Sequence, residues 1–304
     1  MFKNKNMIHL TAGVFGNTEL AKKLGKAGTI NDIAIYNHGS SEGIFTYVTV
    51  NSDKIQALLQ VINMIDVPIL AVNEISAIVG EQIIAISEFG FDNGFMILDG
   101  ITEEAIKPLI KGTCIEKFSV VDAKELVESM KKITVERGND LLVTIDNYFD
   151  VKSVGTVILG IMKSGAVRKY DKVIVEPIGK EVMVKGIQSQ DKDLDAAEAG
   201  MRVGLNLKGI EADELKRGYV IGDVMKSKSF NLKFQKSRYT KEQLKEDDMV
   251  FISSGLQVVA ARVKSVSDTL ELETENYITY RKDTKFLIAS TKQNMPRIIG
   301  KAFL

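Results

Sequence analysis

Cysteine and histidine are almost missing from this 304-residue sequence, which contains only Cys114, His9 and His38. A single cysteine excludes an internal disulfide and a cysteine-cluster metal site. Two histidines disfavour a histidine-based metal centre or catalytic triad, and we expect His9 to lie in a strand and His38 in a turn. The sequence therefore predicts no metal site and no histidine-dependent catalysis.

An excess of charge of one sign and long apolar runs are also lacking. Lys and Arg number 40, as do Asp and Glu, so the formal net charge is zero and no overall field attracts nucleic acid. An RNA-binding surface must then be a local patch, and DNA is not expected as a partner. No apolar run approaches the length of a membrane span, and the N-terminal residues lack the apolar core of a signal peptide. We expect a cytoplasmic protein without a membrane partner.

The hydrophobic pattern changes near residue 138. Before that point, short apolar runs alternate with segments of helical periodicity, which is typical of a parallel-rich α/β sheet covered by helices on both faces. The expected strands are 8–12, 33–36, 44–50, 68–72, 95–98 and 118–121, and the expected helices are 18–24, 53–65, 76–89, 102–110 and 123–132.

After residue 140 the helical pattern nearly vanishes, and short β-rich segments follow one another with Gly and Asp between them. This spacing is typical of small barrels or sandwiches. The polar stretch 225–229 is interpreted as a linker between two such blocks. We therefore expect an α/β domain at residues 1–137 and two β domains at residues 138–226 and 227–304.

One motif in the β half reads Ile145-Asp-x-x-Phe149-x-Val151-x-x-Val154-Gly155-Thr156-Val157-x-x-Gly160. It resembles the second domain of translational GTPases, the family of elongation factor Tu, the selenocysteine-specific elongation factor and the gamma subunit of initiation factor two. Further matches follow in the same order at 164–167, 171–173, 199–209 and 217–220. Residues 201–211 are most similar to the selenocysteine-specific branch.

This resemblance implies the architecture of elongation factor Tu, with a degenerate P-loop-GTPase-like α/β domain followed by two β-barrels. It also implies tRNA, the ribosome or a translation factor as the partner. Elongation factor Tu places a Glu and a Phe in its aminoacyl pocket, and the matching strand here carries Gln188 and Gln190. These glutamines are interpreted as possible aminoacyl-pocket positions or, preferably, as solvated positions of an exposed strand face.

The expected phosphate loop departs from the family pattern. Such a loop needs Gly-x-x-x-x-Gly-Lys-Ser/Thr after the first strand, but the chain reads Gly13-Val-Phe-Gly16-Asn-Thr18-Glu19-Leu20. Thr18 takes the place of the second glycine, Glu19 that of the lysine and Leu20 that of the Mg²⁺ ligand. A carboxylate there repels a triphosphate by roughly 1 kcal/mol or more. We favour a structure in which Glu19 fills the anion site and Thr18 caps the helix over a retained phosphate site.

The other two nucleotide motifs are absent from the sequence. Asp-x-x-Gly occurs nowhere, and the position of Asn-Lys-x-Asp is taken by Asp99-Gly100-Ile-Thr102, whose threonine cannot accept the two bonds that guanine offers to a carboxylate. These losses favour a non-catalytic paralogue without a cofactor. One alternative is a divergent GTPase that still binds GTP with magnesium, and another is a protein–protein interaction module that binds no RNA.

Basic residues interleaved with aromatic residues after residue 226 are typical of RNA-backbone contacts. The alternative is a solvated linker and first strand, because an acidic cluster at residues 242–248 follows at once. The possible RNA contacts are Lys233, Phe234, Lys236, Arg238 and Tyr239, together with Arg202 and Lys208 in the preceding domain.

Overall fold

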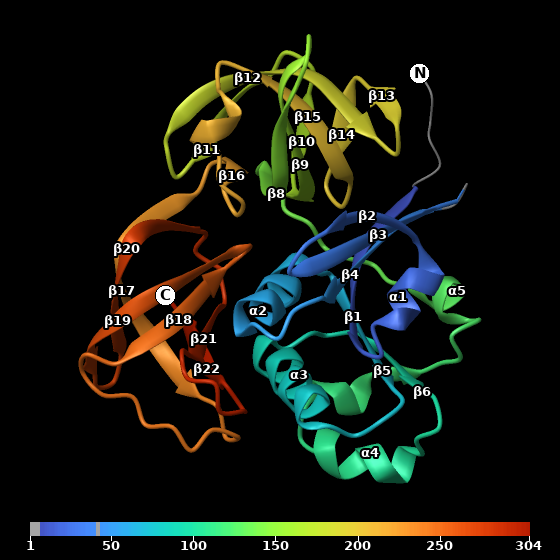
Figure 1. The fold of residues 1–304 in the computed structure, drawn as a ribbon, viewed down its shortest axis with the longest axis vertical. Helices are drawn as coiled ribbons and strands as arrows, with labels where there is room; N and C mark the ends of the chain where they lie inside the picture. Colours follow the sequence, from blue (N-terminus) through green and yellow to red (C-terminus); the bar gives the residue numbers. More distant parts are fainter. Residues whose placement is uncertain (1–6, 41–42) are drawn as a thin grey trace.

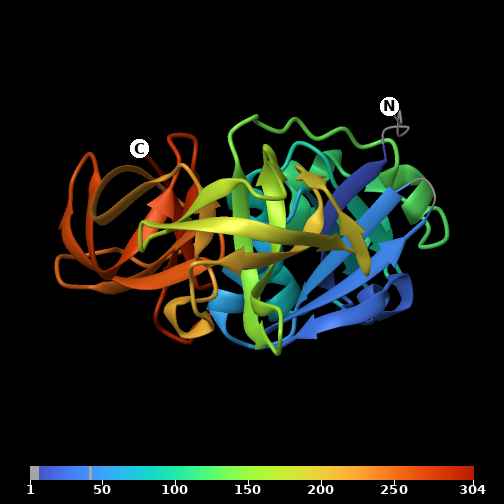
Figure 2. The ribbon, with the colours of Figure 1, turned by 90° about the horizontal axis from the view of Figure 1, so that it is seen from above.

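The computed structural model describes residues 7–40 and 43–304, which form an N-terminal α/β domain and two β-barrels (Figure 1). Residues 1–6, on which the signal-peptide argument depends, and residues 41–42 of the expected turn at 38–43 lie outside the described part. From above, the first barrel lies over the N-terminal domain and reaches toward the second barrel (Figure 2). Within the described residues no helix is long and apolar enough to cross a membrane.

A seven-stranded sheet in the order β2-β3-β4-β1-β5-β6-β7 forms the centre of the N-terminal domain. Strands β1 and β4 to β7 run parallel, whereas β2 and β3 form an antiparallel hairpin at one edge. The strands are β1 (Ile8–Gly16), β2 (Lys26–Ile30), β3 (Ile33–Gly39), β4 (Gly43–Val50), β5 (Val67–Val72), β6 (Phe95–Leu98) and β7 (Ser119–Val120).

Helices cover both faces of this sheet, as the continuous apolar strands predict. Helices α2, α3 and α4 pack on one face and α1 and α5 on the other. The helices are α1 (Glu19–Leu24), α2 (Ile55–Met64), α3 (Ala77–Phe89), α4 (Glu103–Ile110) and α5 (Leu126–Met130), with a 3₁₀ turn η1 (Cys114–Lys117). All the expected helices and strands of this domain are present, and β2 is additional.

The first barrel closes through pairing of β11 with both β16 and β12, in the order β11-β16-β8-β9-β15-β12. Gly160 lies where β9 comes close to its neighbour β8, and a Cβ atom there would lie 2.6 Å from the backbone oxygen of Thr144. The elements are β8 (Leu142–Val151), β9 (Gly155–Ser164), β10 (Ala166–Arg168), β11 (Lys172–Glu176), β12 (Lys180–Ser189), β13 (Lys192–Leu194), β14 (Ala196–Glu198), β15 (Arg202–Lys208), η2 (Ala212–Glu214) and β16 (Val220–Gly222).

The second barrel is closed in the order β17-β20-β19-β18-β21-β22. Residues 225–229, expected as a linker, instead begin β17, because they pair with β20 and leave no free segment between the barrels. The strands are β17 (Met225–Lys236), β18 (Met249–Ser254), β19 (Gln257–Val266), β20 (Leu270–Tyr280), β21 (Phe286–Ser290) and β22 (Ile298–Phe303).

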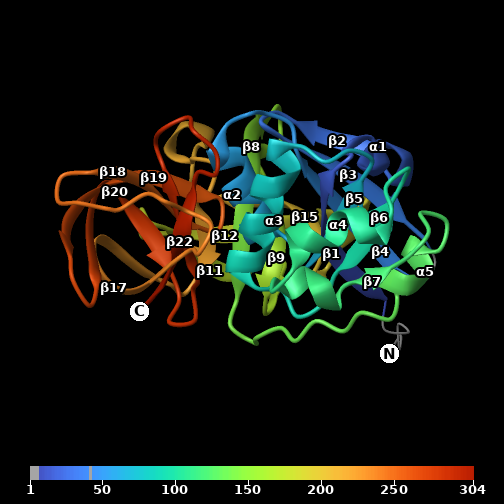
Figure 3. The ribbon, with the colours of Figure 1, turned by 90° about the horizontal axis from the view of Figure 1, so that it is seen from below.

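The second barrel and the N-terminal domain share one hydrophobic core. Leu287, Ala289 and Ile298 of the barrel pack in the same cluster as the buried faces of α2 and α3. From below, α2 and α3 lie between the sheet and strands β18 and β22 (Figure 3). Burial of apolar surface therefore couples the two parts as it couples elements within one domain.

We expect Leu287→Ala to lower the free energy of unfolding by about 2–5 kcal/mol, because it leaves a cavity in this shared core. The Leu287 side chain is fully buried. Urea unfolding followed by circular dichroism should show one transition at lower urea. Met249→Ala is the control, since Met249 is 44% exposed in the same barrel and its loss should change stability by no more than about 0.5 kcal/mol. Separate unfolding of the second barrel, with the main transition unshifted, would contradict the shared core.

Candidate functional site

The segment expected as a phosphate loop is a continuation of strand β1. The strand does not end at Ala12 but runs to Gly16, and Gly13 pairs with Val48 on one side and Pro68 on the other. A Cβ atom on Gly13 would lie 2.6 Å from Cδ1 of Ile65. The expected loop position of Gly13 is therefore wrong, and its lack of a side chain is explained by packing against the residue that follows α2.

The backbone amides after β1 are bonded to acceptors of the protein itself. The amide of Gly16, whose φ of 74° turns the chain, donates to Oε1 of Gln82 at 2.8 Å. The amide of Asn17 donates to the oxygen of Ala71 at 2.8 Å, and that of Leu20 to the oxygen of Asn17 at 3.3 Å. A phosphate-binding turn needs such amides free to face the anion. Gln82 is only 5% exposed, so the acceptor that the Gly16 amide meets is a buried side chain of the protein itself.

The cap of α1 differs from the expectation. Thr18 occupies the N-cap position, but its side chain makes no capping bond because its backbone is already helical. Oδ1 of Asn17 instead accepts the amide of Glu19 at 3.2 Å. The Glu19 carboxylate points to solvent, 62% exposed, and pairs with Lys22 at 2.5 Å, which raises the pKa of Lys22. The helix is thus capped by Asn17, while Glu19 places a negative charge beside the former phosphate position.

The residues at the guanine-motif position serve the start of α4. Oγ1 of Thr102 accepts the amide of Ala105 at 3.3 Å and so caps the helix. The amide of Asp99 donates to the oxygen of Val72 at 2.9 Å, and Gly100 turns the exposed chain with a φ of 77°. Helix capping and local backbone structure therefore account for Asp99, Gly100 and Thr102.

A cleft of about 1720 Å³ lies between the β2–β3 hairpin and strands β12, β13 and β15 of the first barrel. Gln188 and Gln190, the possible aminoacyl-pocket positions, are exposed and both line this cleft. Nε2 of Gln188 donates to Oδ1 of Asp193 at 3.0 Å. The structure therefore brings both glutamines to a concave surface between two domains.

Three buried polar atoms of residues that line the cleft have no hydrogen-bond partner among the described residues: Nδ1 of His9, Oδ1 of Asn37 and Nε of Arg202. Burial and the nearby Arg137 charge lower the pKa of His9, so its ring is neutral at pH 7. Unpaired buried polar atoms are costly. These three atoms are shielded from solvent, so they lie beneath the surface of the cleft and not on it.

Arg202 forms part of the cleft wall. Its Nη2 donates to Oδ1 of Asp146 at 2.9 Å and to Oγ1 of Thr29 in β2 at 3.2 Å, and its side chain is only 11% exposed. Burial raises the pKa of Asp146, and the charge of Arg202 partly offsets this shift. Arg202, a possible RNA contact from the sequence, is therefore largely buried and paired with Asp146, unlike the exposed Lys208.

The other possible RNA contacts divide into two groups. Lys208, Lys233 and Lys236 are exposed, but Lys208 ends β15 in the first barrel while the other two lie on β17. Phe234 packs on the second-barrel core, and Tyr239 on the core shared with α2 and α3. Arg238 donates to the oxygen of Lys111 at 2.6 Å, so it bridges the barrel and the N-terminal domain. The expected basic and aromatic patch is therefore reduced to its lysines.

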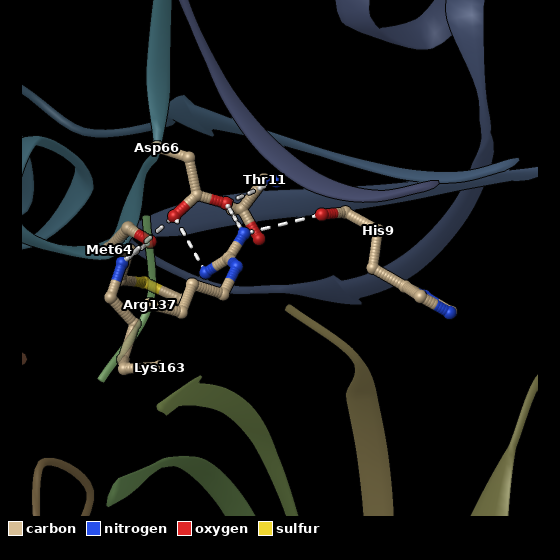
Figure 4. A network of polar contacts seen from close by, with 6 residues as sticks. All are labelled: His9, Thr11, Met64, Asp66, Arg137 and Lys163. Carbon is tan, nitrogen blue, oxygen red and sulfur yellow. Dashed lines mark hydrogen bonds and ion pairs between the residues drawn. The ribbon is translucent and has the colours of Figure 1, made fainter. Parts of the chain in front are cut away.

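An ion network around Asp66 joins the N-terminal domain to the first barrel, and no pattern in the sequence predicted it (Figure 4). Asp66 is bound by Arg137 at 2.7 Å, by Lys163 of β9 at 3.4 Å and by the amide of Thr11 at 2.9 Å. Lys163 also donates to the oxygen of Met64 at 2.9 Å. Burial alone would raise the pKa of Asp66, but the two cations and the hydrogen bonds outweigh it and lower that pKa.

Comparisons with known proteins agree with this geometry. The family described as elongation factor Tu domain 2 matches residues 155–222. An uncharacterized protein of Methanocaldococcus jannaschii is 35% identical over 302 residues, covering 96% of this chain and 98% of that protein. The selenocysteine-specific elongation factor of the same organism is 30% identical over 68% of this chain, which spans 42% of that factor.

Two solved structures share the fold. A bacterial selenocysteine-specific elongation factor matches 98% of this chain and 58% of its own, with a TM-score of 0.82 and 21% identity. The elongation factor SelB of Methanococcus maripaludis, in complex with the GTP analogue GppNHp, matches 98% of this chain and 79% of its own, with a TM-score of 0.80 and 19% identity.

The variant Asp66→Asn should lose about 3–5 kcal/mol of stability at pH 7, because two buried cations lose their counter-ion. The wild-type advantage has a defined pH dependence. The folded pKa of Asp66 lies below the value of about 3.9 in the unfolded chain, so its contribution is complete above that pH and is lost as the pH falls through the folded pKa.

Denaturant unfolding of wild type and variant over a pH series measures this difference. Asp99→Asn, at an exposed position, is the matched control and should leave stability nearly unchanged. A difference between wild type and Asp66→Asn that grows as the solution is acidified would contradict the assigned ion network.

Proposed function

The chain belongs to the translational GTPase superfamily, and we propose that it is a non-catalytic elongation factor paralogue that binds tRNA without hydrolysing GTP. The observation that carries the loss of GTP is the bond from the Gly16 amide to Oε1 of the buried Gln82. An internal acceptor holds the amide that would otherwise face a phosphate. Entry of a nucleotide would require this bond to break.

Charge opposes the nucleotide as well. Glu19 stands where the family has a lysine, and Leu20 where it has a hydroxyl that binds Mg²⁺. Thr102 uses its hydroxyl to cap α4. Each of the three contacts that hold GTP in the family thus has a different task in this chain, and no cofactor is proposed.

The distribution of charge supports RNA binding by the second barrel. Residues 225–304 contain 15 Lys and Arg against 9 Asp and Glu, although the whole chain is neutral. A basic domain within a neutral chain gives phosphate groups a local site of attraction. Lys233 and Lys236 are exposed on β17, and we propose that they contact the RNA backbone.

The cleft beside the first barrel fits the acylated 3′ end of the tRNA. Its volume of about 1720 Å³ exceeds that of ordinary small-ligand pockets, which hold roughly 300–1,000 Å³. An unpaired RNA terminus with its acyl group needs both this space and hydrogen-bonding groups, and polar residues from both domains, among them Asn37 and Gln188, line the cleft. Gln188 and Gln190 line the opposite side from the β2–β3 hairpin.

Titration with fluorescent GTP and GDP in the presence of Mg²⁺ tests the nucleotide half of the proposal. We expect no saturable binding below millimolar nucleotide and no phosphate release, because the amide of Gly16 is occupied and Glu19 repels the phosphates. A working GTPase measured in parallel controls the assay. Micromolar binding with Mg²⁺-dependent turnover would establish the divergent-GTPase alternative instead.

Filter binding of aminoacylated tRNA over a salt series tests the RNA half. Affinity should fall with salt with a log–log slope of roughly −0.7 to −0.9 per phosphate contact, and Lys233→Ala with Lys236→Ala should reduce the slope by about one per lost contact. Lys172→Ala with Lys292→Ala is the matched control, since both lysines are exposed but already paired with carboxylates. Salt-independent or absent binding would favour the protein–protein interaction module.

A further inference from the structure

Helix α3 carries two neighbouring polar side chains that are both buried, Glu81 at 3% and Gln82 at 5% exposure. Successive residues on a helix point about 100° apart, so the two groups reach different neighbours. Gln82 points to Gly16 at the end of β1, whereas Glu81 points to Arg297 at the start of β22. The helix thereby connects the degenerate phosphate loop to the second barrel.

The pair of Glu81 and Arg297 is held by several bonds. Oε1 of Glu81 accepts the backbone amide of Arg297 at 2.7 Å and its Nε at 3.1 Å, and Oε2 accepts Nη2 at 2.5 Å. Nη1 of Arg297 donates to the oxygen of Asp53 just before α2, at 2.8 Å. A forked, charge-assisted pair of this kind fixes orientation as well as distance. Separation of the barrel would leave a buried charge without a partner.

The carboxyl end of α3 is also bound by the second barrel. Nζ of Lys285 donates to the oxygen of Phe89 at 2.9 Å and to that of Gly90 at 3.3 Å, and it lies 5.4 Å from the centre of the Phe89 ring. A cation at this position complements the negative end of the helix dipole. Strand β22 packs against α3, and its residue Ile298 belongs to the same hydrophobic cluster as the buried side chains of the helix. The helix is thus attached to the barrel by both polar and apolar contacts.

From these contacts we propose that α3 is a fixed strut, in which Glu81 and Arg297 hold the second barrel on the N-terminal domain in one arrangement that needs no nucleotide. Next to Glu81 on the same helix, Gln82 accepts the amide of Gly16 at 2.8 Å, so the amide that would face a phosphate is already bonded to the strut. The strut itself does not depend on the proposed function. Only its consequence does, namely that the RNA-binding surface is always assembled.

Hydrogen exchange of the full chain, without RNA, tests the strut. We expect Arg297→Met to raise the exchange rates of α3 and β22 at least tenfold while those of β8 and β9 in the first barrel stay unchanged. Lys292→Met is the control, because Lys292 pairs with Glu242 at the surface of the same barrel. Where Arg297→Met does not fold, Arg297→Lys keeps the charge but loses the fork, and it should give a smaller increase in the same segments.

Small-angle scattering of the wild type gives the second readout, and its profile should be identical with and without GTP, GDP and Mg²⁺. The strut is refuted when Arg297 variants exchange like the wild type at α3 and β22, or when nucleotide changes the scattering profile. Other outcomes would refute the proposed function and leave the strut in place. One is that nucleotide binds without changing the scattering profile. The other is that tRNA does not bind although the exchange pattern is the expected one.

Discussion

Arginines that are buried or partly buried, and that donate to more than one element, hold the three parts of this molecule in place. Arg137 binds Asp66 where the N-terminal domain meets the first barrel, and Arg297 binds Glu81 where it meets the second. Arg281 joins the two barrels through Oγ of Ser164 at 2.8 Å and the oxygens of Asp140 and Leu141. A guanidinium suits this task because its five donors reach several acceptors at once.

Contacts of the same kind hold the walls of the large cleft in position. Across it, Arg202 ties the β2–β3 hairpin to the first barrel through Thr29, while the Asp66 network holds the base of the two domains together. A site whose walls are already positioned loses less conformational entropy on binding than one that must close. In this molecule the contacts of Arg202 and Asp66 position the walls of the cleft without a ligand.

The sequence predicted the parts of the fold that depend on local patterns. Ser76 and Thr102 were placed at helix starts and do cap α3 and α4, and the buried strand at 95–98 has the expected bounds. Strand β2 was missed because it is a mostly exposed edge strand with a glycine and no apolar alternation. Edge strands of this kind are stabilised by their neighbour rather than by their own pattern.

The candidate site was predicted only in part, since its decisive contacts are distant in sequence. Glu81 and Arg297 are 216 positions apart and Asp146 and Arg202 are 56 apart, and no local periodicity marks either pair. The cap of α1 was assigned to Thr18 because its residue type suits an N-cap, whereas the helical backbone at that position gives the role to Asn17. The residue type shows which side chains are able to cap a helix, and the backbone conformation determines which of them does so.

These contacts show that arginine and lysine have different roles in this molecule, and the difference affects how a partner would be recognised. Five of the eight arginines donate to groups of another part of the molecule or across the domain junction: Arg137, Arg202, Arg238, Arg281 and Arg297. The exposed charge left for a partner is then mainly lysine, a point charge that attracts phosphate without reading bases. On the proposed function, the outer surface would supply affinity for an RNA backbone but little choice between RNAs. Discrimination would then fall to the cleft, whose exposed lining includes Gln188 and Gln190.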